Sequence, residues 1–212
     1  TGTNLVLTNL QASDFGWVDV VVTNAYGSVV SAPASLDQSV VVGWGNGLLG
    51  QTDVHPWMTN GIVSIDAGFD FNLALRSDGT VKAWGDNSFG QLGDGTTEDR
   101  LSPVRVRGLP APPTVVATGA VHSCAVLADR RAYCWGQNLH GQLGDGSTES
   151  RFDPVEVAGD LRFITLFAGG AVTCGFAQGG SEYCWGFNQA GQLGDGTRTN
   201  RSTPVRVGGE RP

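Results

Sequence analysis

One hexapeptide occurs three times in this sequence and constrains the fold more than any other feature. Gly-Gln-Leu-Gly-Asp-Gly stands at Gly90–Gly95, Gly141–Gly146 and Gly191–Gly196, with spacings of 51 and 50 residues. A Trp-Gly pair precedes each copy at the same spacings, at Trp84, Trp135 and Trp185. An earlier Trp44-Gly45, followed by Gly50-Gln51, marks a shorter copy. A period of about 50 residues predicts an array of similar units rather than a domain with a single core.

Each unit contains short β-rich runs separated by turns, and no stretch shows a helical period. In the copy that contains Trp84, the expected strands are Ile62–Ala67, Phe71–Leu75, Val81–Trp84 and an alternating run from Pro103 to Val106. Asp78-Gly79 is a hairpin turn signal, and Asn87–Gly95 is a glycine-rich loop. Four short strands in about 50 residues are typical of one blade of an all-β propeller.

These residues closely resemble the regulator of chromosome condensation repeat family. The stretches that carry the resemblance are Ala-Gly-Phe-Asp-Phe-Asn-Leu-Ala-Leu, Ser-Asp-Gly-Thr-Val-Lys-Ala-Trp-Gly-Asp-Asn and Gly-Gln-Leu-Gly-Asp-Gly-Thr. The resemblance implies a seven-bladed propeller, of which residues 40–212 would supply about three and a half blades. We therefore expect the remaining blades to lie outside this sequence; the alternative is an open arc with exposed edges. The Trp-Gly pairs and the hexapeptide glycines are expected to be structural: Trp44, Trp84, Trp135, Trp185, Gly90, Gly95, Gly141, Gly146, Gly191 and Gly196.

The first 39 residues differ from the repeats and form a separate expected domain. The sequence predicts a strand at Val18–Thr23 and, at Asn24–Gly27, a turn into the next strand. The segment resembles the last three strands of an immunoglobulin-like sandwich. Val18 and Val20 stand where that fold often has its corner tyrosine and its inter-sheet cysteine, so neither of those contacts is expected.

The four cysteines fall into two pairs with the same spacing. Cys124 and Cys134 occupy the same two repeat positions as Cys174 and Cys184, and in the preceding copy these positions are Leu73 and Ala83. Two positions on strands that flank one hairpin, either both Cys or both apolar, behave as a contacting pair within reach of a disulfide. We favour bonds Cys124–Cys134 and Cys174–Cys184; free buried thiols are the alternative. Disulfides predict an extracellular, cell-surface or periplasmic location.

Charge and hydropathy exclude several classes of partner. The net charge is −7, and Lys82 is the single lysine, so no basic stripe offers a footprint for nucleic acid. No apolar run is long enough to span a bilayer, so we expect no direct membrane insertion in this segment.

No residue pattern predicts catalysis, a cofactor or a metal. Gly45–Gly50 fits a dinucleotide-binding spacing, but no helical pattern follows it, so a structural role is favoured. Asp94, Asp145 and Asp195 each offer one carboxylate to a loop, too few for calcium. The arginines that recur in register are candidate partner-binding residues, although donation to loop carbonyls or to the nearby Asp is favoured: Arg100, Arg151 and Arg201.

The function expected from these observations is non-enzymatic. A secreted or surface bacterial protein would use the loops on one propeller face to bind a protein partner that the sequence does not identify. The variable loop stretches are Asn46–Pro56, Asp86–Gly90, Thr96–Ser102, Gln137–Gly141, Ser147–Asp153, Phe187–Ala190 and Thr197–Thr203. Two alternatives remain: guanine-nucleotide exchange on a small GTPase, which the family resemblance implies, and a structural spacer in a surface repeat protein.

Overall fold

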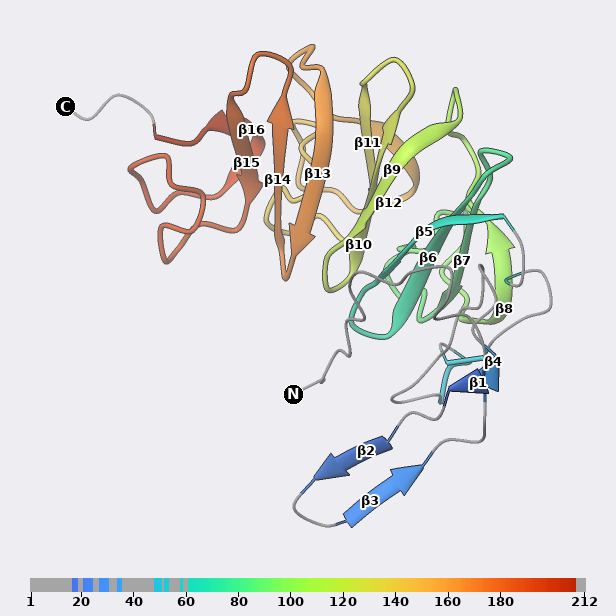
Figure 1. The fold of residues 1–212 in the computed structure, drawn as a ribbon. Helices are drawn as coiled ribbons and strands as arrows, with labels where there is room; N and C mark the ends of the chain where they lie inside the picture. The colour runs from blue at the N-terminus through green and yellow to red at the C-terminus, as the bar shows by residue number, and fades with distance from the viewer. Residues whose placement is uncertain are drawn as a thin grey trace.

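Three four-stranded antiparallel sheets stand side by side in an arc (Figure 1). The computed structural model describes residues 61–208 and shorter segments before them, which are 17–18, 21–24, 27–30, 34–35, 48–50, 52–53 and 58. The first strand of the middle sheet, β9, packs against the first strands of both neighbouring sheets, β5 and β13. Radial sheets whose first strands converge are the arrangement of β-propeller blades.

Each blade is a meander in which strands adjacent in sequence pair with one another. The first blade consists of β5 (Ile62–Ala67), β6 (Phe71–Arg76), β7 (Val81–Gly85) and β8 (Arg100–Arg105). The middle blade consists of β9 (Pro113–Thr118), β10 (His122–Leu127), β11 (Ala132–Gly136) and β12 (Arg151–Glu156). The third blade consists of β13 (Phe163–Gly169), β14 (Val172–Ala177), β15 (Glu182–Gly186) and β16 (Arg201–Arg206).

The all-β fold and the blade architecture expected from the sequence are confirmed, with one shifted boundary. Strand β8 begins at Arg100, three residues before the alternating run at Pro103. Arg100 pairs with Gly85 across a bulge that follows the Ala83–Val104 pair. Because a bulge breaks the period-two alternation, the sequence pattern does not reveal the first half of this strand.

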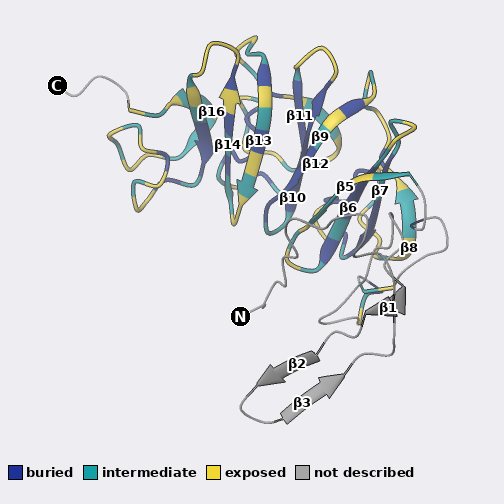
Figure 2. Ribbon diagram, viewed as in Figure 1, coloured by how far each residue is buried: buried dark blue, intermediate teal, exposed yellow. Residues whose placement is uncertain are grey.

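Apolar side chains fill the two spaces between adjacent blades. Figure 2 colours β10 and β11 of the middle blade as buried. Leu73 and Leu92 of the first blade pack with Val116 and Trp135 of the middle blade. Cys124 and Val126 of the middle blade occupy the equivalent space against the third blade, where they pack with the residues Leu143, Phe163, Leu166 and Trp185. Every residue of β10 and β11 is buried, since the middle blade has a neighbour on both sides.

Four short strands are described in the N-terminal segment. β2 (Val21–Asn24) pairs with β3 (Gly27–Val30) in a hairpin, and β1 (Trp17–Val18) pairs with β4 (Ala34–Ser35). The hairpin places its turn between Asn24 and Gly27, where the sequence predicts one. The immunoglobulin-like sandwich and the boundary at residue 39 remain predictions, because most of this segment lies outside the described residues.

Candidate functional site

The long loops of all three blades emerge at the same end of the sheets. Loops 86–99, 137–150 and 187–200 connect the third strand of each blade to its fourth strand. The short turns 68–70, 119–121 and 170–171 lie at this end too, because neighbouring strands are antiparallel. We call this surface the loop end. It contains six of the seven variable stretches that the sequence analysis gives as candidate binding loops. The remaining stretch, Asn46–Pro56, lies largely outside the described residues.

A buried asparagine organises each long loop. In the middle blade, the Asn138 side-chain amide donates to Asp145 Oδ1 at 3.2 Å and to the carbonyls of Ser147 and Glu149 at 3.2 and 3.1 Å. Asn138 Oδ1 accepts the backbone N–H of Leu143 at 2.9 Å. The same pattern recurs around Asn87 and Asn188. One side chain therefore ties together four points of a loop that has no regular secondary structure.

The recurring arginines bind the recurring aspartates of their own loops. Arg100 Nε lies 2.8 Å from Asp94 Oδ2, and Arg201 Nε lies 2.8 Å from Asp195 Oδ2. The equivalent Arg151–Asp145 distance is 3.3 Å. Burial of the Asp195 carboxyl would raise its pKa, but hydrogen bonds from Thr197, Arg201 and Asn188 outweigh it and lower the pKa to about 2. These contacts are the intraloop donation that the sequence analysis favours. A partner-binding role for Arg100, Arg151 and Arg201 stays a prediction.

Each loop is also fixed by the blade that follows it. Trp135 Nε1 donates to the carbonyl of Gln91 at 2.9 Å, and Ser123 Oγ donates to the same carbonyl at 2.7 Å. Trp185 and Thr173 repeat this arrangement on the carbonyl of Gln142, at 2.9 and 2.8 Å. The recurring tryptophan thus connects adjacent blades. Trp84 is buried beside Met58, and Trp44 lies outside the described residues.

The hexapeptide glycines have a conformation that disfavours other residues. Gly90, Gly95, Gly141, Gly146, Gly191 and Gly196 all have φ between 77° and 87°. At Gly90 the neighbouring chain also comes close, because a Cβ there would lie 2.8 Å from Phe152 Cα. Left-handed backbone and close approach together explain why glycine recurs at these positions.

The loop tips differ from blade to blade and expose apolar side chains. Phe69 in the turn after β5 is 80% exposed, and Leu139 at the tip of loop 137–150 is 63% exposed. Phe89, Leu101 and Phe152 are also exposed at this end. Rigid loops with exposed, variable apolar tips are suited to recognise another protein.

Both cysteine pairs are disulfide-bonded at directly opposed positions of a hairpin. Cys124 pairs with Cys134 across β10 and β11, and Cys174 pairs with Cys184 across β14 and β15. The sulfur atoms are 2.12 Å apart in each pair. The bonds favoured from the repeat positions are therefore those of the structure.

Sequence reasoning missed the organising asparagines, although the signal is visible. Asparagine follows Trp-Gly after one variable residue in all three copies, at Asn87, Asn138 and Asn188. The described residues contain no group of three or more His, Cys, Asp or Glu side chains that could hold a metal ion. In the part of the chain that the structure describes, no helix has the length and hydropathy to cross a membrane.

Comparison with known proteins identifies the repeats. Sequence profiles described as the regulator of chromosome condensation (RCC1) repeat match residues 78–126, 129–175 and 180–211, and a second profile of the same repeat matches residues 62–91 and 114–142.

Curated relatives share the repeats but are much longer proteins. The human E3 ubiquitin-protein ligase HERC2 is 33% identical over 139 residues, which are 59% of this chain and 3% of that protein. The ultraviolet-B receptor UVR8 of Arabidopsis thaliana is 39% identical over 100 residues, which are 46% of this chain and 22% of the receptor. The chain thus spans a small part of these relatives.

Solved structures show the same fold. Yeast RCC1 (Prp20), in a crystal structure with Kap60, superposes with a TM-score of 0.67 at 24% identity, over 77% of this chain and 43% of Prp20. Human WBSCR16 gives a TM-score of 0.63 at 19% identity, over 86% of this chain and 44% of that protein. At these identities the likeness establishes the blade architecture.

Proposed function

The chain belongs to the regulator of chromosome condensation (RCC1) repeat family, and on that premise we propose that it is a non-enzymatic module that binds a protein partner through its loop end. The observation that carries the proposal is the contrast between the bases and the tips of the long loops. The bases repeat one hydrogen-bond network in three blades. The tips differ, and the loop end exposes Leu139 at one long-loop tip and Phe69 in the short turn after β5.

The energetics of binding favour such a surface. Asn138 and Trp185 hold loop 137–150 in place before any partner arrives. A preorganised surface loses little conformational entropy on association, so the exposed apolar area contributes more of its free energy to affinity. Large side chains near the centre of an interface usually dominate its binding energy.

We further propose that the protein works in an oxidising compartment, as a secreted or surface protein of a bacterium. The support is chemical: both cysteine pairs are bonded, and structural disulfides persist outside the reducing cytosol. Mass spectrometry of the protein isolated from its native source, alkylated without reductant, should find Cys124, Cys134, Cys174 and Cys184 unlabelled. Labelling of all four cysteines would contradict the proposed location.

A further blade of the same kind is the partner we propose for the outer face of the third blade. Phe176 is 40% exposed there, whereas the equivalent Val126 of the middle blade is 1% exposed because the third blade covers it. Phe167 is exposed on the same face, with its ring 6.2 Å from that of Phe176. Serine at positions 167 and 176 should abolish binding of a hydrophobic dye to this face, and unchanged dye binding would contradict the proposal.

The experiment for the main proposal compares matched variants of the whole chain. Phe69→Asp with Leu139→Asp should lose a crosslinked partner protein that the native chain retains, while Gln189→Ala, at an exposed tip of the third blade, should retain it. Equal retention by all three proteins would refute recognition through these tips. Release of bound GDP from small GTPases is the competing assay, and acceleration by the native chain would instead favour nucleotide exchange.

A further inference from the structure

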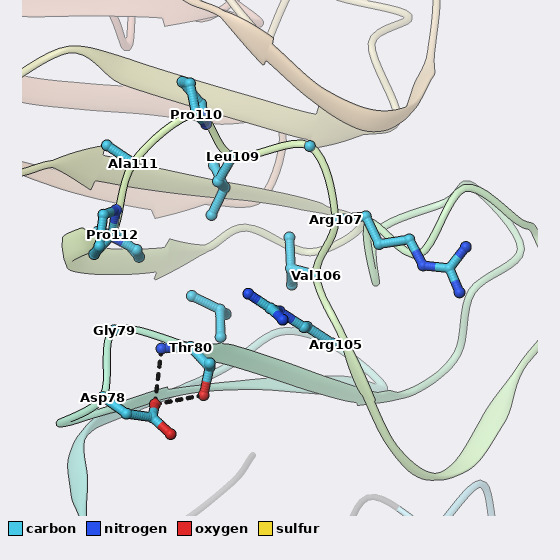
Figure 3. Close-up of a pocket in the computed structure, with 13 residues that line it drawn as sticks. Asp78, Gly79, Thr80, Arg105, Val106, Arg107, Leu109, Pro110, Ala111 and Pro112 are labelled. Atoms are coloured by element: carbon cyan, nitrogen blue, oxygen red, sulfur yellow. Dashed lines mark hydrogen bonds between the residues drawn. The ribbon is translucent and has the colours of Figure 1, made fainter.

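A cavity of about 550 Å³ opens at the opposite end of the blades from the long loops (Figure 3). We call that end the turn end; it comprises turns 77–80, 128–131 and 178–181 and connectors 106–112 and 157–162. The cavity lies between turn 77–80 and connector 106–112, which leads from the first blade to the middle blade. It shares no residue with the loop end, so a ligand bound in it is independent of recognition through the long loops.

The walls of this cavity are held in place by backbone contacts. The N–H of Val106 donates to the carbonyl of Val81 at 3.0 Å, and the N–H of Ala128 donates to the carbonyl of Pro112 at 3.2 Å. A Cβ on Gly79 would lie 2.7 Å from Pro112 Cβ, so the turn and the connector touch. The cavity is therefore preformed and does not need a ligand to open it.

Two arginines at the cavity have no anionic partner among the described residues. Arg105 and Arg107 line it, and neither forms an ion pair or a side-chain hydrogen bond within residues 61–208. Figure 3 shows Arg105 beside Val106 and Arg107 extending outward from the rim. Asp78 is the one carboxylate among the described residues of the lining. It already accepts hydrogen bonds from Arg76 and Thr80. Two charges thus remain available to a ligand.

The strand register adds a third cation beside this pair. Lys82 stands directly opposite Arg105 in the β7–β8 ladder. Directly opposed residues of antiparallel strands face the same side, and like charges in such pairs are destabilising. An anion bound nearby would relieve this repulsion.

The corresponding positions of the middle blade show that the cations are not required by the fold. Tyr133 stands opposite Glu156, and its hydroxyl donates to the Glu156 carboxylate at 2.9 Å. The counterpart of Arg107 is Ala158, and the connector that follows carries an Asp160–Arg162 ion pair. The same blade architecture therefore forms with the charges satisfied internally, which leaves the first blade's arginines available for another role.

Charge is unevenly distributed between the two ends, although the chain as a whole is acidic. In turns, connectors and terminal strand residues, the turn end carries seven arginines and five carboxylates: Arg76, Arg105, Arg107, Arg130, Arg131, Arg162, Arg206, Asp78, Asp129, Glu156, Asp160 and Glu182. The loop end carries four arginines and eight carboxylates: Arg100, Arg151, Arg198, Arg201, Asp70, Asp86, Asp94, Glu98, Asp99, Asp145, Glu149 and Asp195. The turn end is thus the side that attracts anions.

We propose that this cavity binds an acidic peptide segment in which an apolar side chain is flanked by Asp or Glu residues. Leu109 and Pro110 supply an apolar wall, and each guanidinium group offers a planar fork of donors to a carboxylate. A single-stranded nucleic acid would carry the right charge, but no aromatic side chain among the described residues lines the cavity to stack on a base. The apolar wall beside the arginines therefore favours the peptide.

Fluorescence anisotropy with a labelled peptide tests this assignment on the full chain. A peptide with the core Asp-Glu-Leu-Glu-Asp should bind with a Kd of about 10–100 μM at low salt, and affinity should fall as salt rises. The double substitution Arg105→Gln with Arg107→Gln should weaken binding about tenfold or more. Arg206→Gln changes the residue equivalent to Arg105 in the third blade and is the matched control; it should bind like the native chain.

Further probes separate the peptide from other anions. Replacing the central Leu of the peptide with Ser should weaken binding, because the apolar wall loses its contact. Equal affinity for the Leu and Ser peptides, or tighter binding of a single-stranded oligonucleotide or of polyphosphate, would overturn the peptide assignment. Absence of peptide binding, or an equal loss in the Arg206→Gln control, would overturn the site itself.

Discussion

Replacing Asn138 by alanine removes the centre of one loop network and leaves the backbone unchanged. The substitution leaves the buried N–H of Leu143 without an acceptor, which costs about 1–3 kcal/mol. It also removes the donors to Asp145 and to the carbonyls of Ser147 and Glu149, each worth about 0.5–1.5 kcal/mol net. Together these contributions predict a loss of about 2.5–7.5 kcal/mol, a large fraction of the stability of about 5–15 kcal/mol that is usual for a domain.

Urea unfolding of the full chain, followed by tryptophan fluorescence, measures this loss. Trp135 and Trp185 are fully buried on either side of loop 137–150, so their emission reports the blade interfaces. Gln189→Ala, at the exposed tip of another loop, is the control and should change stability by less than about 0.5 kcal/mol. A loss of the same small size in Asn138→Ala would refute the role assigned to the network.

Asn138→Asp separates the acceptor role of this side chain from its donor role. The variant keeps the acceptor for Leu143 but places a carboxylate about 3 Å from Asp145, in place of the donor that stands there at 3.2 Å. Two carboxylates at that distance cannot both ionise readily, so one folded-state pKa rises above its unfolded value. Relative to the native chain, the variant should therefore lose more stability at pH 7 than at pH 4. A deficit independent of pH would contradict this electrostatic reasoning.

Three other perturbations follow from the interfaces between blades. Trp185→Phe keeps the aromatic ring but removes its hydrogen bond to loop 137–150, and urea unfolding should show a loss of about 1–2 kcal/mol. His122 is fully buried, and burial lowers its pKa from 6.5 to about 4. The free energy of unfolding that the neutral imidazole contributes is therefore fully present above pH 6.5 and is lost as the pH falls toward 4. His122→Phe introduces the side chain that Phe71 has at the equivalent position of the first blade. This variant should lack about 2–3 kcal/mol of the pH dependence of stability that the native chain shows between these pH values. Under mild reductant, timed alkylation should label Cys174 and Cys184 before Cys124 and Cys134. The Cys124–Cys134 bond is fully covered by the third blade, whereas no described blade covers Cys174–Cys184.

Local sequence patterns predicted the blades because each signal acts over a short distance. The turn at Asp78-Gly79 and the apolar runs on either side of it define the pairing of β6 with β7, in which Leu73 faces Ala83. The next two copies carry Cys at the same two positions, so the disulfides followed from comparing the copies within the chain. Each copy of the repeat therefore gave a separate prediction of the same local structure.

Features that depend on distant packing could not be predicted in the same way. The Asn138 network joins residues up to 11 positions apart in a loop without periodicity. The cavity at the turn end forms because Gly79 packs against Pro112, more than 30 residues later in the chain. Net charge was also misleading as a guide to surfaces, since it averages an acidic loop end with a basic turn end.

Amide hydrogen exchange, resolved by mass spectrometry, tests the central claim that the long loops are rigid parts of the blades. We expect the amides of Leu92 and Leu143 to exchange as slowly as those of strands β10 and β11, because each is bound to a buried asparagine beneath the next blade. The amide at the exposed tip residue Leu139 should exchange quickly. Rapid exchange across the whole of loops 86–99 and 137–150 would contradict the claim that these loops present a preformed recognition surface.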